Sequence, residues 1–248
     1  MKTTLISALL ALALPVLAAS ATPIETAIAD PARTDKDRER DAREKPAEVL
    51  AFAGVKPGMT VMDMFAGGGY YSELLAGVVG PTGKVLSVNN VPYATYAKDG
   101  IKARFTEGRL PNVERRLVEV SSIHLPPRSV DLIVIVMSYH DAFWVDEKEG
   151  WPDIDTDGFI ESMKRILKSG GKLLIVDHNA PAGTGAEMAG KAHRLNEEFA
   201  KKSLTSHGFV LEKTYDGLRN KDDQLDKMVF DPAVKGKTDR YVHLYRLK

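Results

Sequence analysis

The chain has 248 residues, 44% of them hydrophobic, which is enough for one sizeable core and excludes a disordered protein. Its 34 basic and 34 acidic side chains cancel, and no basic stripe with interleaved aromatic residues occurs, so we expect no nucleic-acid partner. The chain contains no cysteine, which excludes a lipid anchor on an N-terminal cysteine.

The N-terminus has the pattern of a secretory signal peptide. Lys2 precedes an uncharged apolar run from Leu5 to Ala19, and the small residues Ala19-Ser20-Ala21 resemble a cleavage site. The run is shorter than the ~20 residues that span a bilayer, so a retained membrane helix is the weaker interpretation. We predict a signal peptide over residues 1–21, no stable membrane anchor, and a periplasmic or secreted protein.

The next segments predict a leader and a charged helix. Residues 22–33 are rich in Ala, Pro and Thr, which favours a flexible leader before a single domain over residues 34–248. Asp35–Phe52 has the pattern of one helix with a densely charged first half. That charge is most simply a solvated face; alternatively, one of the arginines folds over a binding site as part of a lid (Arg38, Arg40 or Arg43).

Beyond Pro57-Gly58 the pattern alternates strands and helices. Strands are expected at Thr60–Met64, Lys84–Val88, Arg116–Val120, Val130–Met137 and Lys172–Asp177, with helices at Tyr71–Val79, Tyr93–Ala103 and Thr156–Leu167. Single helices between strands predict an α/β fold with a doubly wound, mostly parallel sheet that has helices on both faces. A helix at Glu187–Leu204 and a closing hairpin of Phe209–Tyr215 with Tyr241–Tyr245 complete the expected elements.

The first strand ends in a glycine-rich turn. The strand carries the carboxylate of Asp63, and Gly67 and Gly69 then lead into a helix. Glycine lets the backbone turn tightly and approach a ligand closely, and a helix N-terminus favours anionic or polar ligands. A dinucleotide site is less well supported, because the third glycine of its fingerprint would fall at Ser72.

Three motifs together resemble the class I S-adenosylmethionine-dependent methyltransferase superfamily. They are Asp63-x-x-x-Gly67-x-Gly69, Leu125-Pro126-x-x-Ser129-Val130-Asp131-Leu132-Ile133 and Leu167-Lys168-Ser169-Gly170-Gly171-Lys172-Leu173. Within it, the chain resembles a group of predicted exported bacterial methyltransferases through Lys45–Leu50, Gly67–Tyr71, Tyr139-His140-Asp141 and Gly236–Arg240. The resemblance implies a Rossmann-like, seven-stranded sheet whose last strand pair is antiparallel.

The resemblance also implies S-adenosylmethionine as the cofactor and a set of residues that bind it. By position these are Asp63, Phe65, Ala66, Gly67, Gly68, Gly69, Tyr70, Asn89 and Ser121. Three of them depart from the family pattern. Phe65 stands where members usually have glycine, Asn89 replaces the acid that accepts the ribose hydroxyls, and Ser121 replaces the aspartate that meets the adenine amine.

Candidate catalytic residues follow the fourth and fifth strands, where the acceptor site of such folds lies. Tyr139-His140-Asp141 and Asp177-His178-Asn179 each place a histidine beside an aspartate. His140 and His178 are the candidate general bases because imidazole titrates near neutral pH; the catalytic set is Tyr139, His140, Asp141 and His178. Each histidine has a structural alternative, a hydrogen bond that closes a loop.

Side chains later in the sequence are further candidates for the acceptor site. Arg194 fits a carboxylate or phosphate of a substrate, or else a salt bridge between elements. Phe143, Trp144 and Trp151 flank an acidic loop, where they act as a lid over substrate or as anchoring packing.

Two other function classes remain beside methyl transfer to an unidentified small-molecule substrate. One is a non-catalytic or re-purposed binding module on the same fold. The other is a metal-dependent hydrolase that uses His140, Asp141, Asp177, His178 and His193. No H-x-x-x-H or H-E-x-x-H spacing occurs, so no metal site is assigned from the sequence, and the oligomeric state is open.

Overall fold

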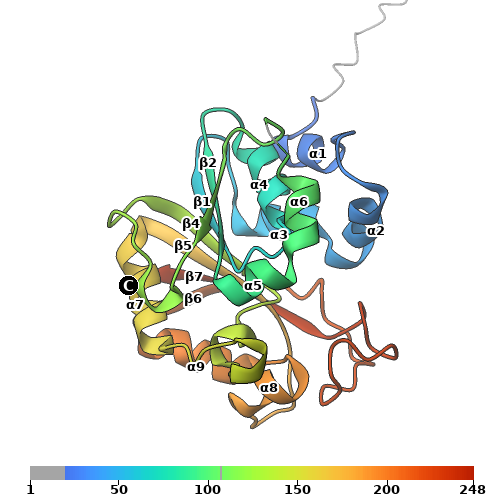
Figure 1. Ribbon diagram of the computed structural model, residues 1–248, viewed down its shortest axis with the longest axis vertical. Coiled ribbons are helices and arrows are strands. Elements are labelled where there is room, and N and C mark those ends of the chain that lie inside the picture. Colours follow the sequence, from blue (N-terminus) through green and yellow to red (C-terminus); the bar gives the residue numbers. More distant parts are fainter. Residues whose placement is uncertain (1–19, 107) are drawn as a thin grey trace, which may run out of the picture.

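Figure 1 shows a computed structural model that describes residues 20–106 and 108–248. The predicted signal peptide, 1–21, lies almost wholly outside these residues. Among the helices described, none combines the length and apolar character needed to cross a bilayer.

One seven-stranded sheet runs through the described residues in the order β3-β2-β1-β4-β5-β7-β6. The first five strands pair in parallel, whereas β7 is antiparallel to both of its neighbours. This confirms the predicted fold class, including the antiparallel last pair. The strands are β1 Thr60–Met64, β2 Lys84–Asn89, β3 Val113–Leu117, β4 Val130–Val136, β5 Leu167–His178, β6 Phe209–Thr214 and β7 Arg240–Leu247.

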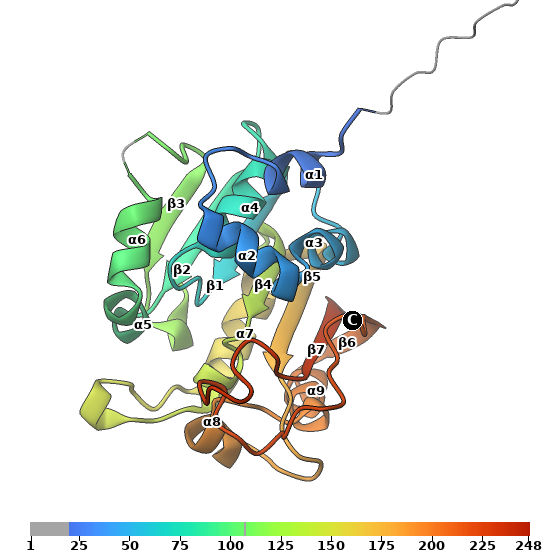
Figure 2. The same cartoon turned by 90° about the vertical axis from the view of Figure 1, so that its right-hand side faces the viewer.

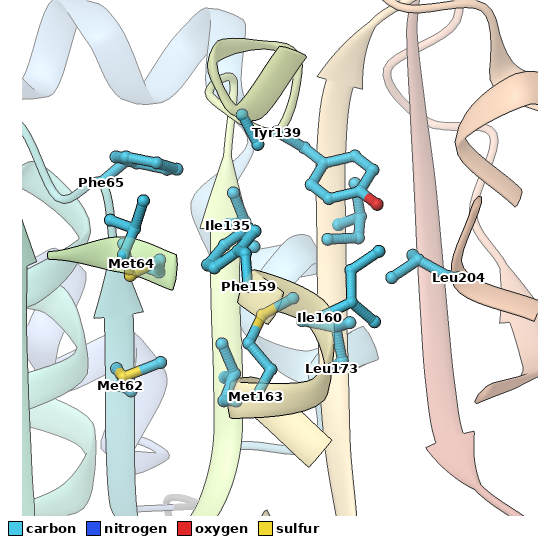
Figure 3. Packing of buried hydrophobic residues seen from close by; sticks show 14 of the residues in the cluster. Met62, Met64, Phe65, Ile135, Tyr139, Phe159, Ile160, Met163, Leu173 and Leu204 are labelled. Carbon is cyan, nitrogen blue, oxygen red and sulfur yellow. The ribbon is translucent and has the colours of Figure 1, made fainter. Parts of the chain in front are cut away.

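Alternate residues of the central strands enter two different cores. On β1, Met62 and Met64 pack with α7 (Thr156–Ile166) and α9 (Glu197–Ser206), as Figure 3 shows in part. Val61 faces the opposite core with α3 (Pro46–Ala53) and α4 (Tyr70–Val79). Side chains alternate across a strand, so a strand covered on both faces must be apolar at successive positions. Figures 1 and 2 show these two helix layers on opposite sides of the sheet.

The segment predicted as a flexible leader is instead folded. Thr22 caps α1 (Pro23–Ile28), and Ala27 is buried in the core beside α4. A Cβ added to Gly77 of α4 would lie 2.7 Å from the Cβ of Ala27, so the two helices approach where α4 lacks a side chain. The expectation of a leader over residues 22–33 was therefore wrong for α1.

The predicted helix over Asp35–Phe52 is two helices. Lys45 ends α2 (Asp35–Glu44) in the left-handed conformation, at a φ of 45°, and Pro46 begins α3. Proline disfavours helical backbone in the residue before it, and this accounts for the break. The charged face of α2 is also less solvated than expected, because Asp37 and Glu44 are buried and pair with Arg104 and Arg240.

Other boundaries differ from the expected ones in a similar way. The predicted helix at Tyr93–Ala103 is α5 (Val91–Tyr96) and α6 (Lys98–Arg104), and the one at Glu187–Leu204 is α8 (Glu187–Ala192) and α9. The third strand lies three residues before the predicted Arg116–Val120, because β3 pairs with β2 in a register that joins Asn89 to Leu117. Short 3-10 turns, η1 Val120–Ser122, η2 His140–Phe143 and η3 Glu147–Glu149, complete the fold.

Candidate active site

A cavity of about 820 Å³ opens at the carboxyl ends of the parallel strands. Its walls come from the segments after β1, β4 and β5, from the C-terminal half of α2, and from the segment before β7. The strand order reverses between β1 and β4, and doubly wound sheets bind ligands at this switch point. The volume lies within the range of small-molecule sites.

The glycine-rich turn after β1 forms one wall of the cavity. Ala66, Gly67 and Gly68 line it, and Gly67 and Gly69 have φ values of 55° and 82° that favour glycine. A Cβ on Gly67 would lie 3.2 Å from the ring of Tyr93, and one on Gly69 would overlap Phe105. Both glycines are therefore required by the shape of the turn and by the rings packed on it.

Asn89 holds this turn in place. Its Oδ1 accepts a hydrogen bond from Gly67 N at 2.9 Å, and its Nδ2 donates to Gly67 O at 3.1 Å. The residue is 5% exposed. Both ends of the amide are thus used by the protein, and an aspartate could make only the first of these two bonds.

Phe65 adopts a left-handed backbone conformation, which glycine, the usual residue at this position in the resembling family, would adopt without strain. Its φ is 54°, and its ring is buried against Tyr93 and Phe159 at centroid distances of 5.6 and 5.9 Å. A bulky residue at positive φ is strained. The ring thus packs into the core beside the turn, and Phe65 also lines the cavity.

Asp63 is buried at the base of the turn. Its Oδ2 accepts a hydrogen bond from Ser72 Oγ at 2.6 Å, and Ser72 also contacts Ser87 Oγ. Burial raises the pKa of Asp63 to about 7, while the bond from Ser72 acts in the opposite direction. Asp63 lines the cavity and belongs to the predicted cofactor set.

The C-terminal half of α2 supplies the cationic wall of the cavity. The Arg40 guanidinium lies 4.0 Å from the centre of the Tyr70 ring, and the hydroxyl of Tyr70 donates to Asp41. Arg40, Arg43 and Tyr70 line the cavity. Arg38 points back to the backbone of residues 30–33, so two of the three lid candidates reach the site.

His140 and Asp177 form a buried pair, and His140 lines the cavity. His140 Nδ1 lies 2.8 Å from Asp177 Oδ1, and the backbone N–H of His140 donates to Asp177 Oδ2 at 2.7 Å. Burial lowers the pKa of His140, but the carboxylates of Asp141 and Asp177 outweigh that effect and raise the pKa to about 9. The register of β4 against β5 brings these side chains together at the carboxyl ends of the two strands.

His178 lies beside this pair in a different electrostatic setting. Its Nδ1 is 2.7 Å from Thr238 Oγ1, and no described residue hydrogen-bonds its Nε2. Burial, together with the positive charges of His140, Arg240 and Arg194, holds the pKa of His178 well below its usual range. Two neighbouring histidines with opposite pKa shifts are typical of an acid and base pair.

Aromatic rings enclose the histidines. Trp144 packs on His193 and Trp151 at centroid distances of 4.6 and 4.7 Å, and Phe230 packs on His193 at 5.3 Å. Trp151 Nε1 donates to the backbone oxygen of Asp141. Trp144 and Trp151 line the cavity, whereas Phe143 packs on Tyr139 and Phe199 outside it.

Several predicted site residues lie elsewhere in the described structure. Tyr139 is fully buried, its hydroxyl lies 2.8 Å from Ser203 Oγ, and Figure 3 shows its ring among the core side chains. Its prediction as a catalytic residue was wrong for this geometry. Asn89, Gly69 and the half-buried Ser121 do not line the cavity either. Arg194 is fully buried and pairs with Asp223, which is the structural alternative of the sequence analysis.

The cavity also contains polar groups that the sequence did not assign. Tyr71 Oη and Arg240 Nε are buried without a hydrogen-bond partner among the described residues, and both residues line the cavity. Arg240 and Thr238 belong to the Gly236–Arg240 motif quoted in the sequence analysis, so that motif could have indicated them as site residues. Buried unpaired polar atoms favour a polar ligand that pairs with them. Together with the glycine turn, they fit a cofactor that is both polar and nucleoside-like, such as S-adenosylmethionine.

Methyltransferases are among the known proteins that this chain matches. A family described as a methyltransferase domain matches residues 55–231. A ubiquinone/menaquinone biosynthesis C-methyltransferase of Shewanella halifaxensis is 28% identical over 131 residues, 52% of this chain and 46% of the relative. A protein of the same name from Saccharophagus degradans is 24% identical over 191 residues, 77% of this chain and 69% of the relative. The chain thus spans about half the length of the first curated relatives it matches.

Among solved structures, an S-adenosylmethionine-dependent methyltransferase from Aquifex aeolicus has the same fold. Its TM-score is 0.57 at 24% identity, with 86% of this chain and 99% of that chain covered. The matched methyltransferase domain supports S-adenosylmethionine as the cofactor, in agreement with the three sequence motifs.

Proposed function

Because the chain belongs to the methyltransferase domain family, we propose that it transfers a methyl group from S-adenosylmethionine to a small-molecule acceptor. One observation carries the proposal. The glycine turn of Ala66–Gly68 and the histidines His140 and His178 line the same cavity at the switch point of the sheet. A cofactor site and a proton-transfer site thus share one enclosed space.

Each wall has a separate task in this proposal. S-adenosylmethionine supplies an electrophilic methyl group when bound. The glycine turn and the α2 wall bind and orient the cofactor. His178 accepts a proton from the acceptor at Nε2, because Nδ1 is held by Thr238. Asp177 orients His140, and Trp144 and Trp151 exclude water. Positioning of this kind supplies most of the acceleration in a group transfer.

The names of the relatives do not identify the methyl acceptor of this protein, because the alignment covers about half of their length. The cavity itself suits a small molecule that combines an apolar or aromatic body with a polar group. Trp144, Trp151 and Phe230 provide the apolar surface, and Tyr71 and Arg240 provide unpaired polar atoms.

We also propose that the protein acts outside the cytoplasm. Support comes from the apolar run Leu5–Ala19 and the small residues at 19–21. The proposal predicts a secreted or periplasmic product whose sequence begins near Thr22. N-terminal sequencing of the product would contradict it if an intact Met1 were recovered only from the cytoplasmic fraction.

A second candidate function is a binding module without transfer activity. It is favoured by Asn89, whose amide is engaged with Gly67 instead of facing the cavity where the family's ribose-binding acid would act. This candidate predicts binding of S-adenosylmethionine without conversion to S-adenosylhomocysteine, for any acceptor offered.

Calorimetric titration with S-adenosylmethionine and S-adenosylhomocysteine tests the proposed function. We expect binding by the wild-type protein and at least a tenfold loss in Gly67→Ala, because the added Cβ meets the Tyr93 ring and the residue lines the cavity. Gly54→Ala is the matched control. Gly54 has a comparable φ of 73° with nothing within 4 Å of its Cβ position, so its substitution adds similar strain away from the site. Absence of binding by either ligand at millimolar concentration would refute the proposal.

A further inference from the structure

Three metal-ligating side chains converge on the cavity wall beside His178. One ligand atom from each of His140, Asp141 and His193 lies within 4.8 Å of the other two. Asp141 Oδ1 is 3.3 Å from His140 Nε2 and 3.7 Å from His193 Nδ1. A tetrahedral ion with bonds of about 2.0–2.2 Å requires ligand atoms about 3.3–3.5 Å apart. The observed separations are therefore close to those of a bound ion.

His140 is oriented as a metal ligand would be. Its Nδ1 is hydrogen-bonded to Asp177 Oδ1, which leaves Nε2 directed to Asp141. Metal-binding histidines nearly always donate their second ring N–H to a carboxylate or carbonyl, and this contact fixes the tautomer. Asp177 is itself fixed by the backbone N–H groups of His140 and His178.

The third ligand is held from a distant part of the chain. His193 separates α8 from α9 in the left-handed conformation, with a φ of 51°, and its ring packs on Trp144 and on Phe230. A helix continuing through this position would carry the ring elsewhere. Two rings and a backbone turn thus fix His193 Nδ1 near Asp141.

The charges around the cluster call for a cation. Asp141 and Asp177 are both buried, yet in the described residues the ion-pair partners of these carboxylates are imidazoles alone, without lysine or arginine. Burial of two carboxylates is costly unless positive charge accompanies them. A proton on His140 provides one positive charge. A divalent ion bound between His140 and Asp141 provides two.

We propose that His140, Asp141 and His193 bind a divalent transition-metal ion, Zn²⁺ or one with similar ligand preferences. Two imidazoles and one carboxylate suit such ions, and the cavity leaves the remaining coordination positions open to a ligand. The role of the ion rests on the proposed function: it binds an oxygen atom of the methyl acceptor and holds the acceptor beside His178. The acceptor class is then a small molecule with a hydroxyl, enol or carboxylate oxygen.

Metal analysis and cobalt titration of the full chain test this site. The protein is purified without a histidine tag or chelator, and its metal content is measured by mass spectrometry; Co²⁺ is then titrated into protein stripped with EDTA. We expect about one ion per chain and the visible absorption bands of low-coordinate Co²⁺. His193→Gln and Asp141→Asn should each weaken Co²⁺ binding at least tenfold, and Asp177→Asn should weaken it about 10–100-fold through His140.

His124→Gln is the matched control, because His124 is exposed and lies outside the cavity. It should bind Co²⁺ as the wild type does, and circular dichroism should show that all variants are folded. The proposal is overturned if the wild type binds Co²⁺ no more tightly than His193→Gln. In that case protonated His140 alone neutralises the carboxylates. Titration of the metal-free protein with S-adenosylhomocysteine separates this failure from failure of the proposed function.

Discussion

At Phe65 the backbone and the side chain favour different residues. The φ of 54° suits glycine, while the buried ring fills the space between Tyr93 and Phe159. Removal of a buried phenyl ring typically costs 3–5 kcal/mol, whereas left-handed strain in a non-glycine residue is about 1–2 kcal/mol. Packing therefore outweighs strain, and the phenylalanine is the more stable choice.

Phe65→Gly and Phe65→Ala separate these two contributions. Both variants lose the ring, but alanine keeps the left-handed strain and glycine does not. We expect a loss of about 2–4 kcal/mol for Phe65→Gly and about 1 kcal/mol more for Phe65→Ala, measured by urea unfolding. Equal or greater stability of the alanine variant would show that the turn relaxes to a different backbone conformation.

Asn89 gives a second prediction at the scale of single residues. In Asn89→Asp the carboxylate keeps the bond from Gly67 N but faces Gly67 O without a proton to donate. We expect a loss of stability of about 1–2 kcal/mol at pH 8 and weaker binding of S-adenosylmethionine. Thermal unfolding and calorimetry measure the two effects.

The adjacent Asn90 is the control for that substitution. Its Oδ1 caps α5 by accepting from Tyr93 N, and its buried Nδ2 has no hydrogen-bond partner among residues 20–106 and 108–248, so Asn90→Asp loses none of the hydrogen bonds described there. It should remain nearly as stable as the wild type. A rise in cofactor affinity in Asn89→Asp would instead mean that this side chain turns toward the ligand, as the family's acid does.

The sequence predicted which residues lie at the strand ends, but it did not predict the directions of their side chains. His140, Asp141 and His178 were predicted because they follow β4 and β5, and the cavity contains all three. Tyr139 was included for the same reason, yet its side chain enters the core. Neighbours at a strand end point in different directions, and their directions depend on the turn that follows, here η2.

At the scale of elements, helix breaks were the main feature missed. The segment from Glu187 to Leu204 reads as one helix, but it turns at His193, and Arg194 then enters the core to pair with Asp223. Arg194 also donates to the backbone oxygen atoms of Asn179 and Lys227. These partners lie far away in the sequence, so helical periodicity contains no signal for the break.

The docking of α9 on β7 gives a pH-dependent prediction. The hydrogen bond with His243 lowers the pKa of Glu197 to about 2, with a further contribution from Arg219, which also pairs with Asp239. The pKa is lower in the folded state than the 4.5 of the free side chain. The stabilisation by Glu197 is therefore complete above about pH 5 and is lost as the pH falls toward 2.

Glu197→Gln should be about 1–2 kcal/mol less stable than the wild type at pH 7, with the difference shrinking toward pH 2. Urea unfolding at both pH values measures this. Glu198→Gln is the control, since the exposed Glu198 pairs only with Lys201 among the described residues. A difference independent of pH would show that Glu197 stabilises through shape and not through charge.

At the scale of the whole molecule, the sheet was the most predictable feature. The apolar run of β4 is long because this strand is buried on both faces, and Gly67 and Gly69 mark the turn between β1 and α4. The seven strands and the antiparallel last pair were predicted from the resemblance to a family. The folded α1 was missed because its burial depends on Gly77 of a later helix. Local composition cannot report such a contact.

The cavity is likewise a property of the assembled chain. Its walls combine α2, the strand ends and the segment before β7, which are far apart in sequence and meet only because β7 lies beside β5. Arg240 at the start of β7 pairs with Glu44 of α2 and so joins α2 to β7 at the cavity.

A crystal structure of the protein with S-adenosylhomocysteine tests the central claim most directly, because it shows where the ligand binds. We predict that the ligand lies in the cavity against Gly67 and Gly68, with its sulfur directed to the wall of His140 and His178. A ligand found in another hollow, such as the one lined by Gly80 and Asn112 at the opposite edge of the sheet, would contradict the account.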